Sequence, residues 1–469
     1  MKKNDKIKIL LSIIILTLII TWFLAGGTFD ANGTFNKAAM TRGGVFDLIL
    51  AIMYSVYYKI HNIFFILTIG GVYGVLSHTN SYRKLVDKTA KMVKGKETFF
   101  FLLTTFLTAL FVSMSAEILV VFMFVPFIVS VFLRCGKDRI TALSAAIGGI
   151  FIGIIGVTFG TYGVEHMNSA IGLSYTKGIG FKIAFFIISY VLYNLFAILH
   201  MNKSHKVLDE TEYDPYLTEE LDEKGKKRKT KLWPTITMFI LLIIVTILGY
   251  INWKTSFGID FFNTLEEKFE KLSVKGIPIL YSLAGSTSAF GNWKDLMGAS
   301  AILLITTLIV SLFNKVSLDD FITNFFEGMQ KVLKVALTFA LVYTIFVLVS
   351  WYGWPTTIIN KLIGSGEFNI FTLLLASIVM AFFFIENNYV GYVLGAFLKN
   401  SYESKALAAT LMINSTFGTL SAILPTSFVI MMGLTALDIS YKSWLAYIWK
   451  FVLSMIVAIL IIISIMVYM

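Results

Sequence analysis

Two carboxylates stand alone in long uncharged segments of the chain. Glu117 is the only charged residue between Glu97 and Arg134, and Glu386 is the only charged residue within residues 368–398. A charged side chain at the centre of a bilayer costs at least about 2.5–3.5 kcal/mol on insertion scales, unless it faces a cavity or a partner. Two such groups predict a polar site inside a membrane protein.

The segments that carry the two acids repeat the same order of features. When residues 99–122 are set over 368–391, Glu117 falls on Glu386 without a gap. After a gap of three residues, the interruption at 159–161 falls on 425–427. A single intramembrane Glu often hydrogen-bonds a neighbouring helix, and Ser and Thr usually bond to carbonyls of their own helix. The repetition favours a site over these local explanations.

The candidate site combines the acids with hydroxyl, amide and backbone groups. Interrupted helices expose N–H groups for anions and carbonyls for cations. The predicted substrate- and ion-binding residues are Ser115, Glu117, Thr158, Gly160, Thr161, Glu386, Asn387, Asn388, Asn414, Pro425, Thr426 and Ser427. The coupling ion is expected to be H⁺ or Na⁺, with a sodium site near Ser115, Asn387 and Thr426. No cofactor and no other metal is expected, because the chain has one cysteine and five histidines.

The composition requires these residues to be positioned by membrane helices. The chain is 57% hydrophobic and 14% charged, whereas soluble domains are roughly 25% charged. Several apolar runs approach the roughly 20 residues that cross a bilayer, so we predict an all-α polytopic protein. The net charge of +11 does not indicate nucleic-acid binding, because the basic residues cluster in loops beside apolar runs.

The positive-inside rule orients the predicted spans in the cytoplasmic (inner) membrane, with the N-terminus in the cytoplasm and the C-terminus outside. Residues 9–26 are interpreted as a retained span rather than a signal peptide. Two amphipathic helices, 44–61 and 317–331, are expected at the membrane surface. The other expected spans are 62–77, 140–159, 180–199, 232–251, 296–313, 335–352 and 443–468.

Two segments are too short and too polar at their centres to cross twice. Residues 98–133 leave one basic loop and return to another, yet two crossings need about 40 apolar residues and a turn. We therefore predict re-entrant hairpins at 98–133 and 368–398, each followed by a broken helix, at 140–172 and 406–437. These features divide the chain into a first repeat (1–200), a cytoplasmic linker (201–231) and a second repeat (232–469).

The two hairpins are expected to enter from opposite sides, which makes the repeats inverted. Inverted repeats with interrupted helices that meet at the midplane are typical of secondary transporters. An ion channel is the alternative from another class, but channels usually build a continuous pore from symmetric subunits. An intramembrane enzyme is disfavoured because the chain lacks HExxH and a GxSxG nucleophile turn.

Several stretches resemble the C4-dicarboxylate anaerobic carrier family, including its YfcC-like branch, within the ion transporter superfamily. They are "IFFILTIGGVYGVLSHTNSYRKLVDKTAKMVKGKE", "SMSAEILVVFMFVPFIVSVFLRCGKDR" and "INSTFGTLSAILPTSFVIMMGLTALDISYKSWLAYIWKFV". The second resembles the family's first hairpin, with Glu117 at the tip and Pro126 after it. The third resembles its final broken helix, with the Pro425–Thr426–Ser427 break.

The resemblance implies a secondary carrier for carboxylates or amino acids that works by alternating access, with coupling to Na⁺ or H⁺ or by exchange. A homodimer is compatible with it. The second hairpin carries "FIENNYVG", where the family typically has small hydroxyl residues. Two acids disfavour a dianion unless they are protonated or screened by a cation, and they suit an ammonium group. We therefore rank an amino acid or related zwitterion above a C4-dicarboxylate as the substrate.

Overall fold

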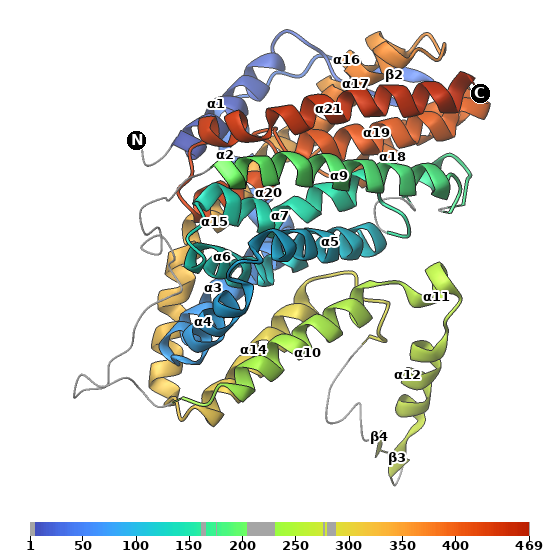
Figure 1. Ribbon diagram of the computed structural model, residues 1–469. Coiled ribbons are helices and arrows are strands. Elements are labelled where there is room, and N and C mark those ends of the chain that lie inside the picture. The colour runs from blue at the N-terminus through green and yellow to red at the C-terminus, as the bar shows by residue number, and fades with distance from the viewer. Residues whose placement is uncertain are drawn as a thin grey trace.

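The computed structural model describes residues 5–160, 166–174, 176–203, 230–274, 277–278 and 288–468. The predicted site residue Thr161 and residues 204–229 of the predicted linker lie outside them. The predicted all-α class is confirmed, and the described part contains six helices that are long and apolar enough to cross a membrane. The two chain ends lie at opposite sides of the helix assembly (Figure 1). The sidedness of the termini and the repeat boundaries stay predictions.

The helices of the first half are α1 (Asp5–Ile20), α2 (Val45–Tyr58), α3 (Ile60–His78), α4 (Ser81–Val93), α5 (Glu97–Ser115), η1 (Leu119–Met123), α6 (Val125–Arg134), α7 (Arg139–Ile155), α8 (His166–Ala170) and α9 (Ile179–Lys203). Those of the second half are α10 (Trp233–Tyr250), α11 (Trp253–Phe257), α12 (Phe261–Lys271), α14 (Met297–Phe313), α15 (Leu318–Tyr352), α16 (Trp354–Ile363), α17 (Ile370–Phe383), α18 (Asn387–Tyr402), η4 (Glu403–Lys405), α19 (Ala406–Ser421), α20 (Phe428–Ala436) and α21 (Tyr441–Tyr468). Two small antiparallel pairs, β1 (Gly27–Phe29) with β2 (Phe35–Lys37) and β3 (Ser273–Val274) with β4 (Ile277–Pro278), lie in the connections.

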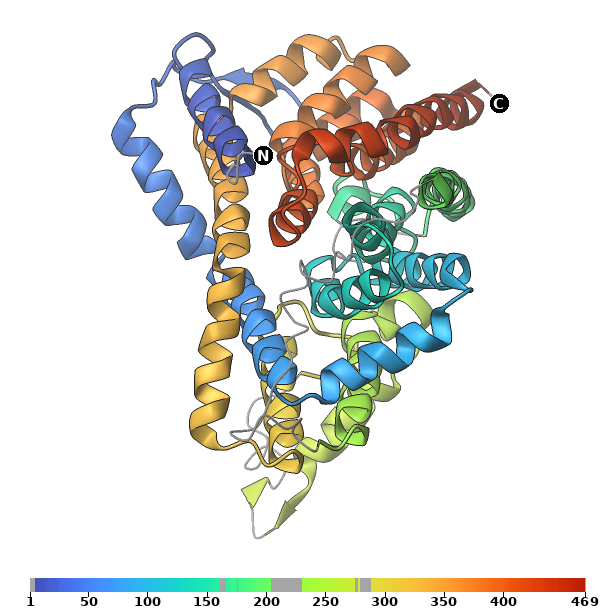
Figure 2. The same cartoon turned by 60° about the vertical axis from the view of Figure 1, so that its left-hand side comes forward.

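The helices pack as two bodies. The frame consists of α1, α2, α3, α10, α14 and α15, with α15 packed along α1, α2 and α3. The hairpin body consists of α5–α9 and α16–α21, with α7 and α19 at its centre. Figure 2 shows the long α15 beside α2 and α3 at one side and the green α9 and red α21 at the other. The bodies meet where α20 and α17 pack on α15 and where η1 packs on α3.

Three glycines set the closest approach inside the frame. A methyl group on Gly70 or Gly74 of α3 would overlap backbone atoms of α15 around Gly328, and a methyl group on Gly328 would overlap α3. Small residues four apart let two membrane helices pack backbone to backbone. Ser55 of α2, the helix before α3, accepts a hydrogen bond from Thr344 of α15 (3.2 Å). The α2–α3 segment and α15 are therefore antiparallel and in close contact along most of their length.

Both predicted hairpins are present as helix–break–helix units. In the first, α5 ends at Ser115 and α6 begins at Val125, and the rings of Phe100 and Phe132 at its base are 5.4 Å apart. In the second, α17 and α18 are separated by residues 384–386, and their distant ends contact each other through Phe368 and Tyr402 (5.2 Å). Each unit therefore folds back on itself. Whether its tip ends inside a bilayer stays a prediction.

The broken helices also form, and one expected boundary is wrong. α7 ends at Ile155 before Gly156, and α19 ends at Ser421 before the turn that holds Pro425. Residues 317–331 and 335–352 were expected to be two elements, but they form one helix of 35 residues, α15. The connecting sequence "KVLKVALT" contains no Gly or Pro, so nothing in it interrupts the helix.

Residues 44–61 pack against another helix of the chain, and their predicted position at the membrane surface stays a prediction. α2 packs along α15, and α3 follows after the single residue Lys59. Backbone hydrogen bonds run through this junction, from Lys59 N–H to Ser55 (3.2 Å) and from Ile63 N–H to Lys59 (3.0 Å). The two helices thus act as one long arm with a bend at Lys59.

Candidate functional site

A small cavity lies where both hairpin breaks and the second broken helix converge. Its lining includes Ile118 beside the first acid and Ile385 beside the second. From the α19–α20 break it includes Thr426 and Ser427, and from α7 it includes Ile154. The repeat alignment predicted that the two breaks converge, and these residues place them around the same space.

The second half of this site has polar groups without partners. The Asn387 side chain, in the first turn of α18, donates to Asn414 of α19 (2.5 Å). Its own oxygen is buried, and no hydrogen-bond partner is present for it among the described residues. The Thr426 hydroxyl is likewise buried and unpartnered there. A buried polar atom without a partner costs about 1–3 kcal/mol, so these atoms mark places for a ligand.

Helix ends strengthen this half of the site. α18 has 16 residues and begins at Asn387, and α20 has 9 residues and begins at Phe428, directly after Ser427. The first N–H groups of each helix have no partner within the helix, and they carry partial positive charge. Their position beside the unpartnered amide and hydroxyl oxygens suits a ligand with both carboxylate and polar groups.

The first half of the site is satisfied by its own groups. The Ser113 hydroxyl donates to the Gly156 carbonyl (2.6 Å) and lies 2.9 Å from the Thr158 hydroxyl. The backbone N–H groups of Thr158 and Gly160 both donate to the Ser113 carbonyl (3.0 and 3.1 Å). The α7 break is thereby fastened to the last turn of α5. Thr158 and Gly160, predicted as ligands, serve here as contacts within the protein.

Ser115 is also engaged locally. Its hydroxyl donates to the Phe111 carbonyl (2.8 Å) and accepts from the Glu117 backbone N–H (3.1 Å). These bonds stabilise the turn at Ala116, whose positive φ of 60° places it in the left-handed region. The structure records no contact that joins Ser115 to Asn387 or Thr426, so the sodium site expected among these three residues stays a prediction.

Glu386 has a basic partner that the sequence interpretation missed. Lys59 of the α2–α3 junction forms an ion pair with the Glu386 carboxylate, and the Tyr343 hydroxyl of α15 donates to the same carboxylate oxygen (3.1 Å). The Lys59 ammonium lies 4.6 Å from the centre of the Tyr343 ring. One available signal was that Lys59, like Glu386, is an isolated charge in an apolar stretch. The partners are 327 positions apart, so only the fold identifies the pair.

Glu117 has a different environment. It is half-buried, and within the described residues no ion pair or side-chain hydrogen bond to its carboxylate is recorded. The charged groups that act on it most are Asp295 and Glu386, both negative. Tyr250 of α10, whose hydroxyl donates to the Asp295 carbonyl (2.7 Å), lies on the same side. Glu117 therefore faces the α10–α14 corner of the frame, and Glu386 faces the α2–α3 arm.

The remaining predicted residues are buried or half-buried near the α18 and α19–α20 ends. Asn388 follows Asn387 in the first turn of α18 and is half-buried, and Asn414 is 5% exposed. Pro425 lies in the turn between α19 and α20 and is half-buried. Asn387 and Asn414 are thus joined directly, while Thr426 and Ser427 line the cavity. Thr161 lies outside the described residues.

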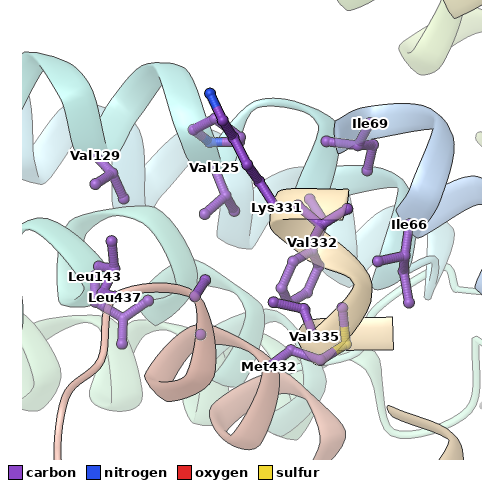
Figure 3. A pocket seen from close by; sticks show the side chains of 14 residues that line it. Ile66, Ile69, Val125, Val129, Leu143, Lys331, Val332, Val335, Met432 and Leu437 are labelled. Atoms are coloured by element: carbon purple, nitrogen blue, oxygen red, sulfur yellow. The ribbon is translucent and has the colours of Figure 1, made fainter. Parts of the chain in front are cut away.

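A larger pocket separates the two bodies, and its wall is almost entirely apolar. Figure 3 shows Ile66 and Ile69 of α3, Val332 and Val335 of α15, and Val125 and Val129 of α6 around it. Leu143, Met432 and Leu437 of the hairpin body close the opposite side, and Lys331 is the charged residue in the lining. With Lys331 as the charged residue among these lining residues, the apolar wall is poorly suited to bind a carboxylate.

Comparisons of this chain with family models, with curated proteins and with solved structures each give a match. A family model described as "C4-dicarboxylate anaerobic carrier" matches residues 4–469. An uncharacterized protein of Haemophilus influenzae is 26% identical over 150 residues, which are 32% of this chain and 30% of that protein. The chain thus matches less than a third of that relative's length. The crystal structure of the Alcanivorax borkumensis YdaH transporter aligns over 98% of both chains, with 13% identity and a TM-score of 0.40.

Proposed function

Because the chain belongs to the C4-dicarboxylate anaerobic carrier family, a family of secondary transporters, we propose that it carries a four-carbon dicarboxylate across the cytoplasmic membrane. The family match over residues 4–469 itself shows that the chain is a multi-pass membrane carrier and not an enzyme. The substrate, the membrane and the coupling are the proposal, and they rest on the charges and polar groups of the site.

The ion pair of Glu386 removes the main objection to a dianion. Two unscreened acids would repel a dicarboxylate, and that reasoning placed an amino acid first. The Lys59 ammonium neutralises Glu386, so the second half of the site has no net negative charge from its acid. The unpartnered Thr426 hydroxyl and two helix N-termini then offer donors to a carboxylate, and N-termini stabilise anions. This pairing is the observation that carries the proposal.

The proposed cycle is alternating access. The substrate is held between the two hairpin breaks, with one carboxylate near the starts of α18 and α20. The hairpin body then moves along the apolar surface between the bodies while the frame stays in place. Coupling to H⁺ or Na⁺, or exchange of one dicarboxylate for another, completes the proposal. An interrupted-helix site at the contact of two bodies is the arrangement that such carriers use.

An amino acid or related zwitterion is the second candidate substrate, and Glu117 is the observation in its favour. Its carboxylate lies near two other acids, Asp295 and Glu386, and within the described residues it has no recorded basic partner. An ammonium group would fit beside it. The two candidates therefore differ in which half of the site binds the distinguishing group.

The test is uptake into proteoliposomes that contain the purified protein. Labelled succinate is offered under an imposed Na⁺ gradient, an imposed proton gradient, and internal unlabelled succinate, each separately. We expect saturable uptake that fumarate and malate inhibit and that neutral or basic amino acids do not. Inhibition by amino acids alone would favour the second candidate, and unsaturable conductance would indicate a channel.

A further inference from the structure

The Lys59–Glu386 pair is one of the contacts that connect the two bodies. Lys59 and Tyr343 belong to the frame, on the arms α2–α3 and α15, whereas Glu386 precedes α18 in the hairpin body. The glycine contact between α3 and α15 fixes the two frame residues relative to each other. A displacement of the hairpin body by more than a few ångströms would therefore separate Glu386 from both partners.

After this separation, the Glu386 carboxylate would lack a cation to balance its charge. Its side chain is 25% exposed and that of Lys59 is 22% exposed, so neither charge is fully hydrated. An uncompensated carboxylate in such a place is costly. The other groups recorded around Glu386 do not neutralise it, because Tyr343 offers a neutral hydroxyl, Asn387 is an amide, and Glu117 is a second acid that brings no positive charge. Another cation is required once Lys59 is withdrawn.

We propose that Lys59 is the resident counter-ion of Glu386 in this state, and that a monovalent cation, a proton or a sodium ion, takes its place when the hairpin body moves. Lys59 and the coupling cation are alternate occupants of one carboxylate. A cation that binds Glu386 only after Lys59 has left shifts the equilibrium between the two states. This role rests on the proposed transport function, and it names the residue that makes the cycle depend on a cation.

The state with the pair formed can be trapped independently of any substrate. The hydroxyls of Thr338 on α15 and Thr435 on α20 are 3.3 Å apart and belong to different bodies. Thr338→Cys with Thr435→Cys, in a Cys135→Ser background that removes the single native cysteine, should form a disulfide in this state when copper phenanthroline and dissolved oxygen are supplied as the oxidant. The initial rate of disulfide formation then reports how often the bodies adopt this arrangement.

With Lys59 present, raising Na⁺ in one series and lowering pH in the other should reveal the cation. After the rates in the pH series are corrected for the thiolate fraction, which falls with pH whatever the state of Glu386, we expect the rate of disulfide formation to fall several-fold in one series. With Lys59→Met, the rate should be lower at low cation concentration, because the state has lost its counter-ion, and it should no longer respond to the cation. Lys59→Arg should keep the response, and Lys361→Met, which changes an exposed lysine of α16, should not alter it.

Two results would overturn the role of Lys59. One is an equal cation response with and without Lys59. The other is no response in either series while Lys59 is present. Neither result depends on which solute is carried. Failure of succinate uptake with an intact cation response would reject the proposed substrate and leave the counter-ion role standing.

Discussion

Each hairpin break carries one acid, Glu117 in the first and Glu386 in the second, and the groups around the two acids differ. At the first break, the hydroxyl and backbone groups around Ser113 and Thr158 satisfy one another, and Glu117 has no recorded cation within the described residues. At the second break, Glu386 is paired with Lys59, while Asn387 and Thr426 keep buried oxygens without partners. At the first break the polar groups bond one another. At the second break the acid is neutralised by a lysine, and two polar oxygens remain available to a ligand.

The contrast indicates that two segments with the same order of sequence features do not contribute equally to the candidate site. Both halves supply a helix break and an acid, yet the frame presents Asp295 and Tyr250 to Glu117 and presents Lys59 to Glu386. Under the proposed function, the frame rather than the hairpin would decide which half accepts an anion. The following changes test that inequality, from the largest expected effect to the smallest.

Replacing Glu386 with Gln should have the largest effect on transport. Lys59 would keep its charge without a carboxylate, and the partly buried pair would be lost. Uptake should fall to near background, with a loss of about 2 kcal/mol in unfolding free energy, between the values for exposed and buried pairs. Uptake in proteoliposomes and thermal unfolding in detergent measure both. Glu367→Gln, an exposed acid before α17, is the matched control. Full activity of the Glu386 variant would remove this residue from the site.

Replacing Asn387 with Ala should weaken substrate binding at the second break. The change removes the side-chain amide, whose nitrogen donates to Asn414 (2.5 Å) and carries a second hydrogen that a substrate carboxylate can accept. One lost hydrogen bond of about 1 kcal/mol should raise the KM for uptake roughly fivefold, with a smaller change in maximal rate. Asn400→Ala, on the same helix but bonded to the Asn32 carbonyl, should leave KM unchanged. An equal effect of both variants would assign Asn387 a structural role only.

Replacing Ser113 with Ala should affect stability more than transport. The variant loses the bonds to the Gly156 carbonyl and the Thr158 hydroxyl and leaves a buried carbonyl with fewer donors. We expect a loss of about 1–2 kcal/mol in unfolding free energy with KM within about twofold of the original. Ser377→Ala, whose hydroxyl bonds only within its own helix to Leu373, should cost less. A large rise in KM for the Ser113 variant would place the substrate at the first break after all.

Replacing Glu117 with Gln should have the smallest effect. The change replaces an acid that lies near Asp295 and Glu386 with an uncharged amide, so thermal stability should stay the same or rise slightly. Dicarboxylate uptake should persist. A complete loss of uptake would make the two acids functionally equivalent and would favour a substrate or ion that binds Glu117 directly.

The sequence predicted the breaks because they are local features. Pro425 and the glycines around Gly160 disfavour continuous helix, and a lone acid in an uncharged segment indicates a special position whatever lies around it. The role of Lys59 was not predicted, because it depends on Glu386, which lies 327 positions further along the chain. The alternation of Tyr and apolar residues around it also resembled a surface helix. The continuity of α15 was missed because its charged first half looks unlike its apolar second half.

The close contact of Gly70, Gly74 and Gly328 has a consequence for distant sites. Eleven residues of helix, about 16 Å, separate Gly70 from Lys59. A side chain introduced at this crossing would push α3 and α15 apart. Lys59 and Tyr343 would then move away from the Glu386 carboxylate that both contact. A mutation at Gly328 would then impair transport while every group of the binding cavity remained chemically intact.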